Sequence, residues 1–160
     1  ARLGSLRKAL VAGAQFVGPE NSIGLVSFST TVTTLLPVKR FNVAHKGSFV
    51  AAAEELRAVG NTAMYDGVAV SLDILASEVE KNPNAKPLLF VLSDGATNRG
   101  ASFEQLAPIV EGLQVPVYTI GYEANLDELK RLSALVEAAS IDAAAGEIEY
   151  KIGALLNAQM

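Results

Sequence analysis

The sequence predicts an α/β fold with a doubly wound, mostly parallel sheet and helices on both faces. Short apolar runs, such as Leu-Leu-Phe-Val-Leu over 88–92, are typical of strands buried on both faces of a sheet. These runs alternate with segments whose apolar residues recur at helical spacing, and this alternation indicates crossover connections between parallel strands. Because no linker or low-complexity segment interrupts the 160 residues, we expect 1–160 to form a single domain.

The first part of the chain should contain two helices and two strands. Leu3, Leu6 and Leu10 fall on one helical face, and Gly18-Pro19 stops that helix. A β-rich run follows, and a tight bend divides it into two strands. The predicted elements are a helix over 2–17, strands over 22–30 and 31–38, and a helix capped by Ser48 that runs to Arg57.

The rest of the chain continues the alternation. Val68, Leu72 and Leu75 recur at helical spacing, and Ser102 with Gln105 forms a capping-box pattern. The predicted elements are helices over 63–81 and 102–113, strands over 88–93 and 115–122, a helix opened by Asn125 with Glu128, a weak strand or loop over 139–146, and a helix from Glu147 onward.

Composition argues against several kinds of protein. A net charge of −4 and a pI near 5.0 argue against non-specific nucleic-acid binding, which needs a basic surface. No apolar segment approaches the roughly 20 residues of a membrane-spanning helix. The chain has no cysteine, and its one histidine, His45, is expected in a solvated loop, so a zinc site is not expected.

Two oxygen-bearing side chains are predicted to meet at the carboxyl edge of the sheet, where ligands bind in open parallel sheets. Asp94 directly follows the strand at 88–93, and Thr62 is placed at the first turn of the helix over 63–81. A carboxylate and a hydroxyl are hard ligands suited to Mg²⁺ or Mn²⁺, although two protein ligands alone hold such an ion poorly. The structural alternative makes Thr62 a helix cap and Asp94 part of a turn.

The segments around these two residues resemble a known family. "GNTAMYDGVAVSLDIL" and "KPLLFVLSDGATNRG" are similar to the second and third metal-binding segments of von Willebrand factor type A (vWA) domains, and "IGLVSFST" resembles that family's second strand. The resemblance implies a metal-ion-dependent adhesion site (MIDAS) with a divalent ion, usually Mg²⁺. Thr62 and Asp94 match its threonine and its last aspartate, and an acidic side chain of a protein partner completes the coordination of the ion.

The family's first segment, Asp-x-Ser-x-Ser, does not occur in the sequence. No aspartate has serines at the required offsets, and the chain opens directly in a predicted helix. A decayed site would keep the central strand, because its loss would expose two unpaired strand edges. We therefore expect the natural protein to continue upstream with a strand that ends in this motif. Without such a strand, the metal site should be weak and the chain should tend to self-associate.

The sequence favours a non-enzymatic module that binds a protein partner. A metal-assisted hydrolase would need a general base near the ion, and the sequence offers no convincing one. A scaffold with a vestigial metal site is the remaining alternative. Asp66 is expected to be solvated or to stabilise a helix dipole, and Arg99 to be a solvated surface residue. Resemblance to bacterial surface or secreted members implies an extracellular or cell-surface location.

Overall fold

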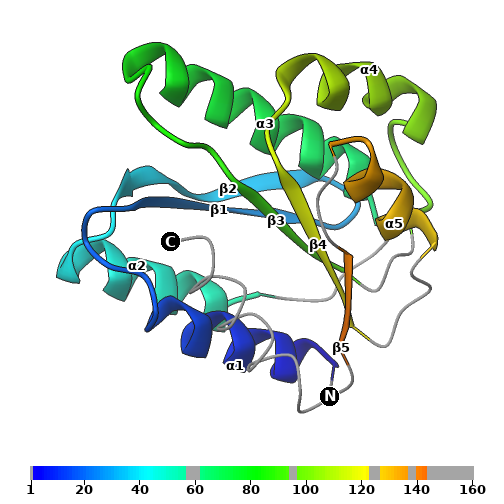
Figure 1. Cartoon of the computed structure of the whole chain (residues 1–160). Helices are drawn as coiled ribbons and strands as arrows, with labels where there is room; N and C mark the ends of the chain where they lie inside the picture. The colour runs from blue at the N-terminus through cyan, green and yellow to red at the C-terminus, as the bar shows by residue number, and fades with distance from the viewer. Residues whose placement is uncertain (1, 57–61, 94–96, 123–126, 137–139, 144–160) are drawn as a thin grey trace. The chain divides into compact units, whose positions relative to one another are not determined.

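A computed structural model describes residues 2–56, 62–93, 97–122, 127–136 and 140–143 (Figure 1). The described elements follow in the order α1 (Arg2–Ala14), β1 (Ser22–Phe28), β2 (Val32–Arg40), α2 (Val43–Glu54), α3 (Met64–Lys81), β3 (Leu89–Ser93), α4 (Phe103–Leu113), β4 (Val117–Tyr122), α5 (Asp127–Ala134) and β5 (Ser140–Ala143), and from α3 onward helices and strands alternate. None of the described helices is long and apolar enough to cross a membrane. The chain divides into two compact units, one of residues 1–27, 34–58 and 143–160 and the other of residues 28–33 and 59–142.

The first unit contains α1, α2 and most of the paired strands β1 and β2. The two helices lie side by side (Figure 1). As predicted, the first segment is helical, but α1 ends at Ala14 and tighter turns carry the chain to Val17. This unit has its own small core, which consists of Ala14, Val17, Leu36, Phe41 and Phe49.

The predicted start of the next helix is wrong. α2 begins at Val43, and Asn42 is its cap because the Asn42 side chain accepts a hydrogen bond from the His45 backbone N–H at 2.9 Å. Ser48, the expected cap, lies inside the helix, and its hydroxyl donates to the Ala44 carbonyl. His45 is also not a solvated loop residue: it is buried, with Nε2 2.7 Å from the Ile23 carbonyl oxygen.

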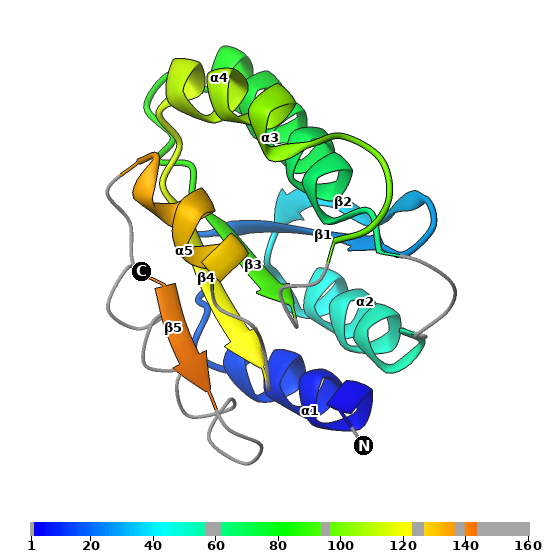
Figure 2. The ribbon, with the colours of Figure 1, turned by 90° about the vertical axis from the view of Figure 1, so that its right-hand side faces the viewer.

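The second unit is built on a sheet with the strand order β3-β4-β5. β3 and β4 pair in parallel, with Leu89 opposite Val117 and Ser93 opposite Gly121, and α4 lies between them in the chain as the predicted crossover helix. α3 and α4 run side by side, and α5 packs beside β4 (Figure 2). The segment predicted as a weak strand or loop contains the strand β5.

The helices of the second unit bury the apolar residues that their helical spacing in the sequence predicts. Val68 and Leu72 of α3 are buried, and Leu106 and Val110 of α4 are almost inaccessible. The capping box of Ser102 and Gln105 is present with both of its hydrogen bonds, so the predicted start of α4 is confirmed. Two predictions, the capping residue Asn125 and the helix from Glu147, fall outside the described residues.

Candidate functional site

The segment around Thr62 is bound to the loop that follows β3. The Thr62 backbone N–H donates to Asn98 Oδ1 at 2.9 Å, and the Thr62 carbonyl accepts from the Asn98 N–H at 3.0 Å. The Thr97 hydroxyl donates to the same carbonyl at 3.3 Å. Asn98 thus binds the backbone of Thr62 in both directions, once through its side chain and once through its own backbone N–H. These bonds join two segments that are 35 residues apart in the chain.

A second contact extends this pairing by one helical turn. Asp66, in the first turn of α3, accepts a hydrogen bond from the Ala101 backbone N–H at 3.0 Å. Its carboxylate therefore binds the loop and is not simply solvated, as the sequence suggested, although its place in the first turn also suits the helix dipole. We call the contacts of Thr62 and Asp66 with residues 97–101 the loop latch.

The loop latch requires glycine at position 100. Gly100 has φ +78°, in the left-handed region that L side chains rarely adopt. A Cβ at this position would lie 1.7 Å from Asp66 Oδ2, so a side chain there would displace the carboxylate. Gly100 therefore allows the chain to turn close enough for Ala101 to reach Asp66.

The structure assigns the helix cap to a residue other than Thr62. The N-cap of α3 is Ala63, and no side chain caps this helix. Thr62 was predicted in the first turn of this helix, but it lies just before that turn. Its backbone is fixed by Asn98, and the backbone N–H of Ala63 donates to the Ser29 carbonyl at 2.8 Å. The segment that carries the Thr62 hydroxyl is thus held on two sides.

The other predicted ligand, Asp94, lies outside the described residues. It follows Ser93, the last residue of β3, and precedes the loop latch by only a few residues in the chain. In the described part of the chain, no three His, Asp or Glu side chains are grouped so that they could hold a metal ion. Thr62 fits a hard divalent ion by its chemistry, since a hydroxyl oxygen suits Mg²⁺ or Mn²⁺, but it needs oxygen partners from elsewhere in the chain.

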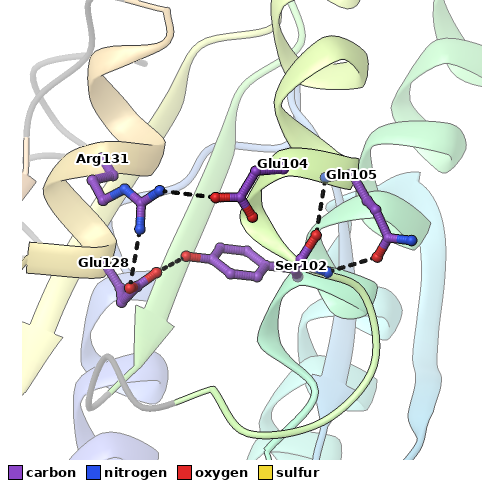
Figure 3. A network of polar contacts seen from close by, with 6 residues as sticks. Ser102, Glu104, Gln105, Glu128 and Arg131 are labelled. Atoms are coloured by element: carbon purple, nitrogen blue, oxygen red, sulfur yellow. Dashed lines mark hydrogen bonds and ion pairs between the residues drawn. The ribbon is translucent and has the colours of Figure 1, made fainter.

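A second polar group links the first turns of α3 and α4 with α5. Tyr65 donates a hydrogen bond from its hydroxyl to the Glu128 carboxylate. Arg131 pairs with Glu128 at 3.3 Å and with Glu104 at 3.6 Å, and it lies between these two acids (Figure 3). The Arg131 guanidinium also stacks 4.0 Å from the centre of the Phe103 ring. We call Tyr65, Glu104, Glu128 and Arg131 the polar clasp.

The environment of Tyr65 stabilises its neutral form. The side chain is only 2% exposed, and its ring meets the Phe103 ring edge-on at 6.0 Å. Burial, followed by the hydrogen bond to Glu128 and the negative charge of that carboxylate, raises the pKa of Tyr65 far above the usual tyrosine value. The hydroxyl therefore remains a donor throughout the physiological range.

This shift predicts a loss of stability at alkaline pH. Because the pKa of Tyr65 is higher in the folded chain than in the unfolded one, its contribution is fully present below the unfolded value of about 10 and declines as the pH rises above it. Urea unfolding of the wild type and of Tyr65→Phe, from about pH 8 to about pH 12, measures this. We expect a steeper decline for the wild type above about pH 10. Parallel curves for the two proteins would contradict the shift.

The polar clasp forms one wall of an open pocket of about 470 Å³. The other wall is the loop over 97–102, which includes the exposed side chain of Arg99, as the sequence predicted. The pocket is thus lined by charged groups of both signs, next to the segment that holds Thr62.

Comparison with known proteins identifies the family. The sequence profile of the von Willebrand factor type A domain matches residues 6–146. The chain belongs to the von Willebrand factor type A family. The α/β fold class expected from the alternation of strands and helices is confirmed for this vWA domain, as is the resemblance noted in its sequence. No curated protein sequence matches the chain.

Solved structures agree on the fold of this vWA domain. A von Willebrand factor type A protein from Catenulispora acidiphila superposes with a TM-score of 0.85 at 13% identity, over 97% of this chain and 37% of that one. An aerotolerance-related membrane protein from Bacteroides fragilis has a TM-score of 0.76 at 13% identity, over 99% and 89% of the two chains. The chain thus spans little more than a third of the Catenulispora protein.

One similar structure contains a metal ion. Proximal thread matrix protein 1 from the mussel byssus, with a zinc-occupied MIDAS motif, has a TM-score of 0.73 at 19% identity, over 98% of this chain and 41% of that one. At these identities the superpositions show a common fold.

Sequence reasoning missed the residues that hold the site together. Asn98 and Gly100 could have been noticed, because "TNRG" combines a residue that pairs with backbone and a glycine suited to positive φ. Glu128 was singled out only as a capping residue, but its carboxylate binds Tyr65 and Arg131. Nothing in the sequence indicates that Tyr65 and Glu128 meet, because 63 residues separate them.

Proposed function

We propose that this vWA domain binds a protein partner through a divalent metal ion, Mg²⁺ or Mn²⁺, held by Thr62 and Asp94, and that it is not an enzyme. The observation that carries the proposal is the loop latch, which binds the Thr62 segment to the loop that follows Asp94 in the chain. Membership of the vWA family supports it, because vWA domains are known for metal-dependent binding of proteins.

The bound ion would supply positive charge that attracts a carboxylate of the partner. The residues proposed to hold it are the hydroxyl of Thr62 and the carboxylate of Asp94, and both are ligands of the hard, oxygen-preferring kind. Asp66 is not among the proposed ligands; its role in the proposal is to hold the loop through the Ala101 N–H. Further oxygens are expected from other parts of the protein and from the partner's acidic side chain.

Chemical catalysis has less support than binding. A hydrolase that uses the ion would need a general base beside it. His45 is buried against the Ile23 carbonyl in the first unit, and Asp66 is bound to the loop. Among the described residues, no side chain combines a free basic group with a place beside Thr62. A scaffold with a vestigial metal site remains the second candidate, because the 160 residues contain no Asp-x-Ser-x-Ser segment.

Selection of displayed peptides tests the proposal without knowledge of the partner. Random peptides would be captured on the natural protein in Mg²⁺ and eluted with EDTA. We expect the eluted peptides to share an Asp or Glu whose change to Asn or Gln weakens binding by about tenfold or more. Peptides that bind equally well in EDTA, or that need no acidic residue, would contradict the proposal and favour the scaffold.

A further inference from the structure

Thr62, just before α3, and Asp66, in its first turn, both take part in the loop latch, and Tyr65 lies between them in the chain. Thr62 and Asp66 bind residues 97–101 on one side, and the Tyr65 hydroxyl binds Glu128 of α5 on another. A displacement of this turn would therefore change the loop latch and the polar clasp together.

Burial makes the Tyr65–Glu128 contact difficult to replace. The Tyr65 side chain is 2% exposed, so water cannot readily take over its hydrogen bond, and an unpaired buried hydroxyl is costly. The Glu128 carboxylate, which accepts this hydrogen bond, is itself held by an ion pair with Arg131, and the Arg131 guanidinium stacks on the Phe103 ring. A hydrogen bond to a charged group is also stronger than one between neutral groups. The contact thus defines one position of the first turn of α3 relative to α5.

We propose that Tyr65 is a positioning residue, whose hydrogen bond to Glu128 holds Thr62 and Asp66 where they can bind the 97–101 loop. In this role Tyr65 acts through the segment that carries Thr62 and not by contact with the ion. The consequence for metal affinity rests on the proposed function, whereas the effect on the loop latch can be measured without metal.

Amide hydrogen exchange of the metal-free natural protein tests the positioning role. The N–H groups of Asn98 and Ala101 donate to Thr62 and Asp66, so they report directly on the loop latch. In Tyr65→Phe, which removes only the hydroxyl, we expect both to exchange about fivefold faster. The N–H of Leu89, bonded to the Pro116 carbonyl at 3.0 Å in the same unit, should change much less.

Two variants separate positioning from general stability. Ser133→Ala also removes a buried hydroxyl, but one that donates within α5 to the Leu129 carbonyl, so the Asn98 and Ala101 amides should keep their wild-type exchange. Glu128→Gln keeps an acceptor for Tyr65 and loses the charge that pairs with Arg131. If the hydrogen bond is what matters, this variant should stay within about twofold of the wild type at both amides.

The outcomes distinguish this inference from the proposed function. Unchanged exchange at Asn98 and Ala101 in Tyr65→Phe, or equal acceleration at Leu89, would overturn the positioning role. In a natural protein that binds Mn²⁺, Tyr65→Phe should also weaken Mn²⁺ binding several-fold while Ser133→Ala does not. Absence of Mn²⁺ binding by the wild type would overturn the proposed function, and the exchange rates would still decide the role of Tyr65.

Discussion

Gly100→Ala should destabilise the second unit by about 2–4 kcal/mol and open the loop latch. The left-handed conformation at φ +78° costs a residue with a side chain about 1–2 kcal/mol. The added methyl group would also push away the Asp66 carboxylate, whose hydrogen bond to Ala101 involves a charged group and is worth about 1.5–3 kcal/mol. Urea unfolding gives the change in stability, and hydrogen exchange at Ala101 shows whether the latch has opened.

A matched control and a double variant identify the cause. Gly112→Ala, in α4, places a methyl group where no atom lies within 4 Å, so we expect no loss and up to about 1 kcal/mol of gain. Asp66→Ala removes the clash partner, so Gly100→Ala combined with Asp66→Ala should cost less than the sum of the single changes. Strict additivity, or a neutral Gly100→Ala, would contradict the described contact.

Leu129→Ala should destabilise the protein by about 2–5 kcal/mol. The Leu129 side chain is inaccessible to solvent, and it anchors α5, a helix of only eight residues, in the core of the second unit. Since α5 also carries Glu128 and Arg131, its loosening should release the polar clasp. Thermal or urea unfolding measures the loss.

The neighbouring Lys130→Ala provides the comparison for this second change. Lys130 is exposed on the same helix, so its truncation should alter stability by no more than about 0.5 kcal/mol. Equal losses for the two variants would mean that α5 does not depend on its buried face. A large loss for Leu129→Ala alone would support the packing described for this helix.

The parts of the fold that local sequence encodes were predicted well. The apolar spacing of Val68 and Leu72 predicts the buried face of α3, and Ser102 with Gln105 predicts the start of α4. Both patterns depend on residues within one or two helical turns, so the sequence contains them directly. The predicted start of α2 was wrong because Ser48 and Asn42 are both residue types that cap helices well. The packing of Phe41 against His45 and Phe49 favours a helix that starts after Asn42.

For the candidate site, the sequence indicated which residue types could bind a metal ion, but not which segments contact one another. Thr62 was predicted in the first turn of α3 but lies just before that helix, and its partners Asn98 and Thr97 lie about 35 residues away in the chain. Which segments meet across a sheet edge depends on topology and loop conformation, and spacing along the chain does not contain this information. The same holds for Asp66, whose role depends on the left-handed turn at Gly100.

Titration of the natural protein with Mn²⁺ tests whether Thr62 and Asp94 hold a metal ion. We expect saturable binding that Thr62→Val and Asp94→Asn each weaken by about tenfold or more, since each variant removes an oxygen ligand or its charge while preserving size. Thr34→Val, at an exposed position of β2, should bind Mn²⁺ like the wild type. Wild-type affinity in both ligand variants, or no binding by the wild type, would contradict a metal site at Thr62 and Asp94.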